Sequence, residues 1–175
     1  MSHTKNQREH DVLVRRALAH HEARKYSSAL SLFMQALRKV PGCPVAQYNI
    51  ANTSHMLGRH KSARAILMKL VSADHKTLGD SCRGVSARSL QMDAYHLLSL
   101  VELHCSGSLS KALVFAKQHL RQRRRGLRSI WALKQVRNDI ERMTSQRRLA
   151  PRSGGRTGDR VPSPYIGARA AQLNR

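Results

Sequence analysis

Acidic residues are scarce in this 175-residue sequence, which has 10 Asp and Glu against 32 Lys and Arg. The formal net charge of +22 excludes an acidic surface and favours negatively charged partners, namely acidic proteins, nucleic acid or anionic membranes. The four Glu and six Asp are accompanied by no nucleophile signature and no Gly-rich phosphate loop. The sequence therefore predicts a protein that is not an enzyme and uses no cofactor.

Cysteine and long apolar runs are also few. Cys43, Cys82 and Cys105 form no C-x-x-C pair and no even-numbered secretory framework, which favours reduced thiols. No apolar run approaches the roughly 20 residues that a membrane-spanning helix requires. The N-terminal segment MSHTKNQREHDV lacks the apolar core of a signal peptide. These absences predict a cytoplasmic protein without a membrane span.

Ten histidines are present, and some of them lie next to one another or next to a cysteine. These are His20 with His21, His55 with His60, and His104 with Cys105. Zinc requires three or four converging ligands, and none of these pairs has a further ligand at an expected offset. We therefore predict surface or groove histidines and no metal site.

The most informative feature that is present is a phrase that occurs twice. Residues 23–37 return as residues 57–71, exactly one 34-residue period later. Ala29 then matches Ala63 and Phe33 matches Leu67, so small side chains match small ones and large match large. Self-similarity at a fixed period indicates a repeat architecture. We expect the alanines to lie where two helices cross closely and the large side chains to fill the space one turn later.

Apolar residues recur at helical spacing along most of the chain, and turn residues separate the helices. Pro41 stops one predicted helix, and Gly58 is placed to end another in the left-handed conformation. The phrase returns in weaker form around Ala112, displaced by 15 residues from its expected place. The predicted helices span 10–24, 27–40, 45–57, 62–73, 86–105, 109–121 and 127–144, and residues 76–85 are predicted to form a loop.

These residues resemble the tetratricopeptide repeat, whose 34-residue unit is a pair of antiparallel helices. The resemblance spans roughly residues 10–120, and it is clear in two repeats and degenerate in the third. The matching positions are Ala17, Ala29, Phe33, Ala36 and Pro41 in the first repeat, Ala51, Gly58, Ala63, Leu67 and Leu70 in the second, and Ala112 in the third.

The resemblance implies an all-α fold, a right-handed superhelix of about three helical hairpins with a capping helix at the C-terminal end. We predict a flexible N-terminus at 1–9 and a helical domain at 10–144. Its repeats lie at about 10–43, 44–75 and 93–121, and the capping helix lies at 127–144. Periodicity is lost from Ser145 onward, so residues 145–175 are predicted to be a disordered basic tail.

The family also implies a concave groove, lined by the first helix of each repeat, in which partner peptides dock. Candidate groove residues are Arg16, His20, Asn49, Asn52, His55 and His96, with Arg15 beside them. Asn49 matches the central Asn of a clamp that grips chaperone C-terminal carboxylates, although a structural role for this Asn is favoured. Val14, Leu18, Leu97 and Val101 replace the other clamp residues, so the clamp is absent. The implied function is that of an adaptor or scaffold for a protein or peptide partner.

A basic segment near the C-terminal end supports a rival hypothesis. Between Arg121 and Arg152 lie 11 basic and two acidic residues, including Arg121, Arg123, Arg124, Arg125, Arg128, Arg147 and Arg148. Such clusters can neutralise nucleic-acid phosphates, but Trp131 is the only aromatic residue available for stacking, and it is expected to pack beside the capping helix instead. A solvated turn is the alternative for the arginines. An acidic protein partner would suit both halves of this basic chain, which slightly favours it over nucleic acid.

Overall fold

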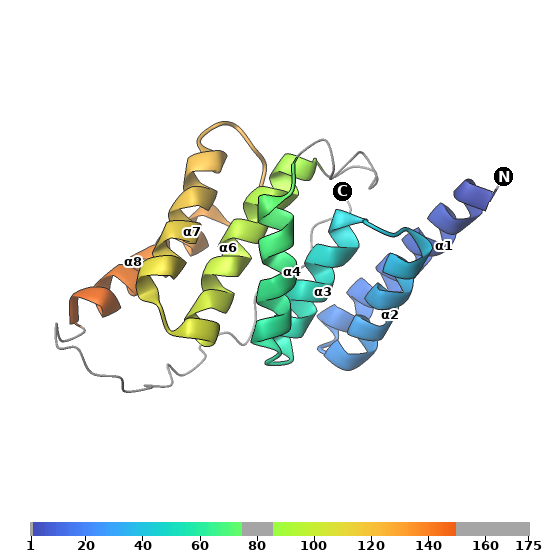
Figure 1. Ribbon diagram of the computed structural model, residues 1–175, viewed down its shortest axis with the longest axis horizontal. Coiled ribbons are helices and arrows are strands. Elements are labelled where there is room, and N and C mark those ends of the chain that lie inside the picture. The colour runs from blue at the N-terminus through green and yellow to red at the C-terminus, as the bar shows by residue number, and fades with distance from the viewer. Residues whose placement is uncertain (1, 75–85, 150–175) are drawn as a thin grey trace.

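The computed structural model describes residues 2–74 and 86–149, and within these ranges the chain contains seven helices and no strand. The helices are α1 (Ser2–Glu22), α2 (Tyr26–Lys39), α3 (Pro44–Met56), α4 (His60–Ser72), α6 (Ala87–Ser106), α7 (Leu109–Arg123) and α8 (Leu133–Leu149). Figure 1 shows them side by side in chain order, from α1 at one end to α8 at the other. The protein is thus an all-α helical-repeat solenoid, as the sequence predicts.

The helices form three hairpins, α1–α2, α3–α4 and α6–α7, and each helix packs on the next one in the described chain. Helix α3 also contacts α6, so the first helices of the second and third hairpins touch each other directly. Gly58 and Gly107 have φ angles of 73° and 63° at the turns of the second and third hairpins. At the turn of the first hairpin, Arg24 adopts the same left-handed conformation, with φ 58°. Unlike glycine, arginine has a Cβ atom that makes this backbone conformation less favourable.

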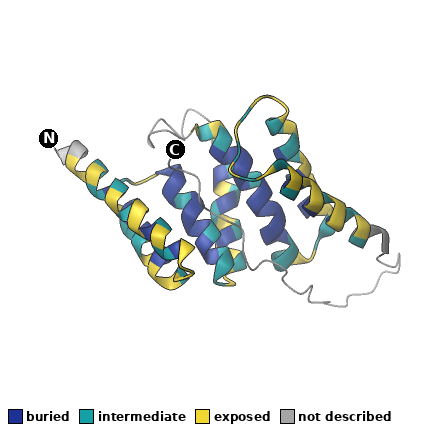
Figure 2. Cartoon of the chain, turned by 180° about the vertical axis from the view of Figure 1, so that it is seen from behind, coloured by how far each residue is buried: buried dark blue, intermediate teal, exposed yellow. Residues whose placement is uncertain are grey.

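Small side chains lie between the paired helices, where the two backbones approach most closely. Ala17 and Ala29 are 0% exposed in one cluster, and Ala51 and Ala63 are 0% exposed in another. In the third hairpin Ala112 packs in a cluster with Leu100, so a large side chain replaces one of the two small ones. Figure 2 shows that α6 is buried along most of its length, whereas α1 and α2 are exposed on much of their surface.

The two ends of the described chain differ from the sequence-based expectation. Helix α1 begins at Ser2, within the range predicted to be flexible, and Glu9 forms an ion pair with Lys39 of α2. Helix α8 begins at Leu133 instead of residue 127, because tertiary hydrogen bonds of Ser129 and Trp131 replace helical ones. The predicted loop at 76–85 and most of the predicted tail lie outside the described residues.

The cysteines also require a correction. Cys43 is fully buried and disulfide-bonded, whereas Cys105 is a free, partly exposed thiol. The interpretation of all three cysteines as reduced thiols was therefore wrong, because spacing along a chain does not show which thiols the fold brings together. Disulfides are rare in reducing compartments, which counts against the predicted cytoplasmic localisation. That localisation stays a prediction. Within the described residues no helix is both long and apolar enough to cross a membrane.

The close helix crossing at Ala63 can be tested with one added side chain. Ala63→Leu should lower the free energy of unfolding by about 1–3 kcal/mol, because the larger side chain cannot fit between α3 and α4 without moving them. Ala65→Leu is the matched control, since Ala65 is exposed on the same helix. Urea unfolding followed by circular dichroism measures both, and equal stability of the two variants would contradict the crossing.

Candidate functional site

The predicted groove residues divide into accessible and buried ones. Arg16 is exposed and His20 is half-buried on α1, and Asn52 is half-buried on α3. Arg15 is exposed beside Arg16. These side chains lie on the first helices of the first and second hairpins, and all of them reach solvent. A polar, basic surface is therefore accessible at the N-terminal end of the solenoid.

Asn49 and His96 are buried instead. The Asn49 side chain is 5% exposed, and its Nδ2 donates a hydrogen bond of 3.0 Å to the Val45 carbonyl of its own helix. This contact satisfies the amide locally and supports the structural role for Asn49. His96 is 0% exposed, with its ring against the Trp131 indole and close to His119. Neither residue is available to an incoming ligand in this conformation.

His55 belongs to a group that the sequence did not predict. His55 of α3, His60 of α4 and His104 of α6 form a histidine trio at the junction of the second and third hairpins. The Nδ1 atoms of His55 and His60 are 3.1 Å apart, and the rings of His60 and His104 stack at 4.5 Å. His60 and His104 also line an open pocket with Lys61 and Cys105. The spacing along the sequence pairs His55 with His60, but only the fold shows that His104 lies beside them.

Burial keeps the histidine trio neutral near pH 7. It lowers the pKa of His55 to about 4, and repulsion from protonated His60 and His104 acts in the same direction. Burial also lowers the pKa of His60 and of His104. No group of three or more His, Cys, Asp or Glu side chains within the described ranges is arranged to hold a metal ion. The trio is thus a packed, uncharged contact between helices at neutral pH.

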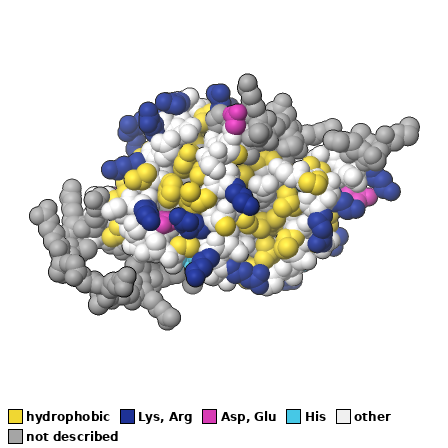
Figure 3. Space-filling model, viewed as in Figure 1, with side chains coloured by type: hydrophobic (Ala, Val, Ile, Leu, Met, Phe, Trp, Pro, Cys, Tyr) yellow, Lys and Arg dark blue, Asp and Glu magenta, His cyan; other side chains and the backbone are white. Residues whose placement is uncertain are grey.

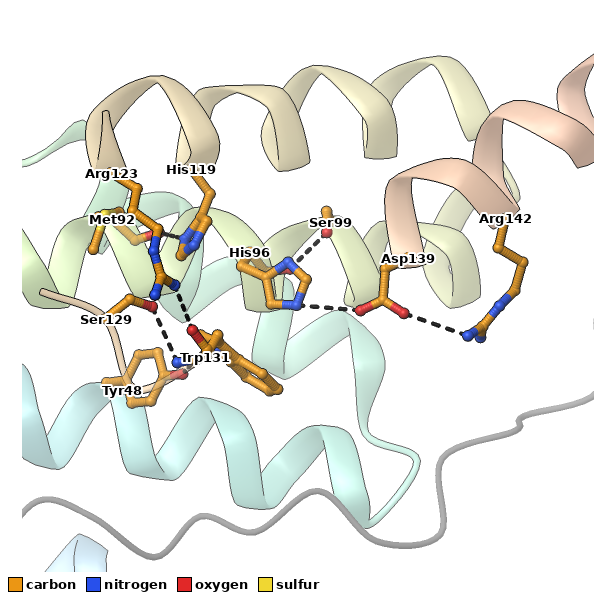
Figure 4. Close-up of polar contacts among 10 residues, drawn as sticks. All are labelled: Tyr48, Met92, His96, Ser99, His119, Arg123, Ser129, Trp131, Asp139 and Arg142. Atoms are coloured by element: carbon orange, nitrogen blue, oxygen red, sulfur yellow. Dashed lines mark hydrogen bonds and ion pairs between the residues drawn. The ribbon is translucent and has the colours of Figure 1, made fainter. Parts of the chain in front are cut away.

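The segment between α7 and α8, residues 124–132, is here called the α7–α8 connection. It reaches back to the first helices of two hairpins (Figure 4). The Trp131 indole Nε1 donates to the Tyr48 hydroxyl of α3 at 3.2 Å, and the ring meets His96 of α6 edge-on at 4.7 Å. Trp131 also packs against the cluster that contains Met143 of α8, as expected, and on the larger core cluster. The indole therefore joins three helices.

Further polar contacts fix the α7–α8 connection. The Ser129 hydroxyl donates to the Asp93 carboxylate of α6, and the Ile130 N–H donates to the other carboxylate oxygen at 3.3 Å. The Arg123 guanidinium donates to the Trp131 carbonyl. Burial raises the pKa of Asp93 to about 6, although the bonds from Ser129 and Ile130 oppose this shift. Asp93 is thus a buried acceptor whose polar contacts come from a single irregular segment.

Helix α8 is held on α6 by a buried pair. The Asp139 carboxylate lies 3.4 Å from Nε2 of His96, and the Asp139 side chain is 2% exposed. Arg142 of α8 lies 3.5 Å from the other oxygen of Asp139. Figure 4 shows this pair beside the Trp131 contacts. The connection and α8 together cover the part of α6 that the sequence assigned to the groove.

The predicted basic patch is only partly free. Arg121, Arg124, Arg125 and Arg128 are exposed and form an arginine cluster at the end of α7 and in the connection, whereas Arg123 is engaged with Trp131. The side chains of Arg147 and Arg148 lie outside the described residues. On the face drawn in Figure 3, Lys and Arg side chains are scattered widely and few acidic ones are visible. Basic charge is therefore spread over this surface.

Sequence reasoning missed the roles of Asp93, Ser129 and Tyr48. The helical pattern was extended from residue 127 without a break, although Ile130 is 36% exposed and precedes the helix. One signal was available: the only Trp of the chain follows a Ser by two residues, just before an apolar stripe that continues to Met143. The hydrogen-bond partner of Trp131 is Tyr48, which lies 83 residues earlier in the chain. A local sequence pattern cannot predict a contact between residues so far apart.

Residues 20–80 match the family model of the tetratricopeptide repeat. Among solved structures, the chain is similar to the first TPR of Spaghetti (RPAP3) bound to the HSP90 peptide SRMEEVD, at 13% identity and a TM-score of 0.59, with 81% of this chain and 95% of that one covered. It is also similar to the Sgt2 TPR domain from Aspergillus fumigatus, at 19% identity and a TM-score of 0.61, with coverages of 91% and 92%. No curated protein sequence matches the chain.

The histidine trio makes the stability dependent on pH. Because the pKa of His55 is lowered in the folded state, its contribution is complete above about pH 6.5 and is lost as the pH falls toward 4. His55→Asn removes this titration. We expect the variant to lose on the order of 1–2 kcal/mol less unfolding free energy than the parent between pH 7 and pH 5. Urea unfolding at both pH values measures the loss, and equal losses would contradict the role of His55.

Proposed function

We propose that this tetratricopeptide-repeat protein is an adaptor for protein–protein interaction that binds an acidic segment of its partner at the N-terminal part of the solenoid. The observation that carries the proposal is the division of the first helices. Arg15, Arg16 and His20 of α1, and Asn52 of α3, reach solvent, whereas Asp93 and His96 of α6 are covered by the α7–α8 connection and α8.

The charge of the accessible part indicates the chemistry of the partner. Arg15 and Arg16 are exposed, and they belong to a chain with a formal net charge of +22. Complementary charge steers association and favours one register of a bound segment. The RPAP3 domain with the same fold was solved with the peptide SRMEEVD, whose sequence contains three acidic residues. This supports an acidic segment as the kind of ligand that such a scaffold can hold.

The binding mode proposed here does not use the carboxylate clamp. Leu97 and Val101, which replace two clamp residues, are at most 1% exposed and belong to the core. A peptide carboxylate would find no cation at these positions. Arg16, His20 and Asn52 offer instead a guanidinium, an imidazole and an amide on two neighbouring first helices. We therefore propose that internal acidic side chains of the partner, and not its C-terminus, supply the negative charge.

A charge reversal on α1 tests this proposal. Arg16→Glu should reduce the capture of acidic protein partners from the native cell about tenfold, because it replaces an attractive contact by a repulsive one. Arg38→Glu is the matched control, since Arg38 is exposed on α2, the second helix of the same hairpin. Quantitative mass spectrometry of nuclease-treated captures measures the effect.

Two outcomes would contradict the proposal. If both variants lose their partners equally, net charge matters and the α1 surface does not. If nuclease removes the partners of the parent chain, the arginine cluster binds nucleic acid and bridges other proteins through it. That second result would come with a steep loss of binding as the salt concentration rises.

A further inference from the structure

The α7–α8 connection has the features of a bound peptide. It is irregular between the end of α7 at Arg123 and the start of α8 at Leu133. Two of its side-chain hydrogen bonds go to the first helices of two different hairpins, to Tyr48 on α3 and to Asp93 on α6. These are the helices that the repeat predicts to line a groove. The connection therefore lies where an external segment would be expected.

The surface under the connection is built to receive specific groups. The Tyr48 hydroxyl accepts the indole N–H, and the Tyr48 side chain is only 1% exposed. Asp93 is 3% exposed and accepts the Ser129 hydroxyl, two residues before the indole, and the Ile130 N–H, one residue before it. A buried carboxylate that loses both donors would carry an uncompensated desolvation cost. A segment bound in this groove must therefore donate hydrogen bonds to Tyr48 and Asp93, whether it belongs to this chain or to a partner.

The connection also remains partly exposed to solvent. Trp131 is half-buried, Ile130 is 36% exposed, and Arg128 is exposed. Tyr48 and Leu97, which belong to the core cluster on which Trp131 packs, are each 1% exposed. A partly exposed segment thus covers a buried apolar cluster that carries two polar acceptors, Tyr48 and Asp93. This arrangement differs from an ordinary core, in which both partners are inaccessible.

We infer that the groove between α3 and α6 is a second peptide-binding site, specific for an extended segment with a hydroxyl residue two positions before a Trp, and that Ser129–Trp131 occupy it as an internal ligand. A partner segment of this chemistry competes with the connection for Tyr48 and Asp93. The site is separate from the accessible surface of α1, so the inference goes beyond the proposed function, and its test does not involve the acidic partner.

Binding in trans provides the test. The probe is a fluorescein-labelled peptide with the sequence of residues 126–134, GLRSIWALK. The full chain carrying Ser129→Ala and Trp131→Ala should bind it about tenfold more tightly than the parent, whose own connection occupies the groove most of the time. Fluorescence polarisation measures the affinities. A peptide with the same two substitutions is the matched control and should not bind.

Equal, weak binding to the parent and to the folded double variant would overturn the inference. Circular dichroism establishes whether the double variant is folded. If it is not, a milder variant gives the answer, because Trp131 is the only Trp and its emission reports on the connection alone. Tyr48→Phe combined with Ser129→Ala removes two side-chain hydrogen bonds but keeps the apolar contacts.

This second variant should show red-shifted emission and stronger acrylamide quenching of Trp131 at unchanged helix content. Added unlabelled peptide in which Trp is replaced by Phe should increase both effects in a concentration-dependent way. Emission and quenching identical to those of the parent, at any peptide concentration, would show that the connection is a fixed part of the core and would overturn the inference.

Discussion

The spacing between paired helices depends on the alanines at their crossings. Ala29 and Ala63 have no exposed surface and pack against Ala17 and Ala51 of the preceding helices. Close approach of the backbones lets Phe33 and Leu67 interdigitate one turn later, both at 0% exposure. The hairpins thereby become flat units that can stack, and stacking places α3 against α6. The contacts of the α7–α8 connection with Tyr48 and Asp93 follow from that placement.

The sequence predicted the fold because its signals were local. Ala, Gly and large apolar residues recurred at a 34-residue period, and helical spacing located the hairpins. The candidate sites were only half predictable, because they depend on residues far apart in the chain. His96 was assigned to the groove from its register, but the register does not report that α8 and Trp131 cover it. The α8 start was misplaced for the same reason: Asp93 binds Ser129 and Ile130, and periodicity does not register such bonds.

Three acidic residues of the described part of the chain lie in its interior. Asp93, Glu102 and Asp139 are at most 3% exposed, and each of them joins two helices or a helix and the connection. Glu102, for example, accepts from Arg64 of α4 at 2.7 Å. Buried carboxylates are not available on the surface to balance its positive charge. Their burial adds to the excess of basic charge that the composition already gives to the surface.

A solenoid of hairpins is normally a one-dimensional array in which each unit senses only its neighbours. The bond between Tyr48 and Trp131 changes this, because it joins residues 83 positions apart and skips most of the third hairpin. It raises the contact order of an otherwise local topology and closes the second and third hairpins into one ring of contacts. Fraying from the C-terminal end must then break the Tyr48–Trp131 contact before it can reach the second hairpin.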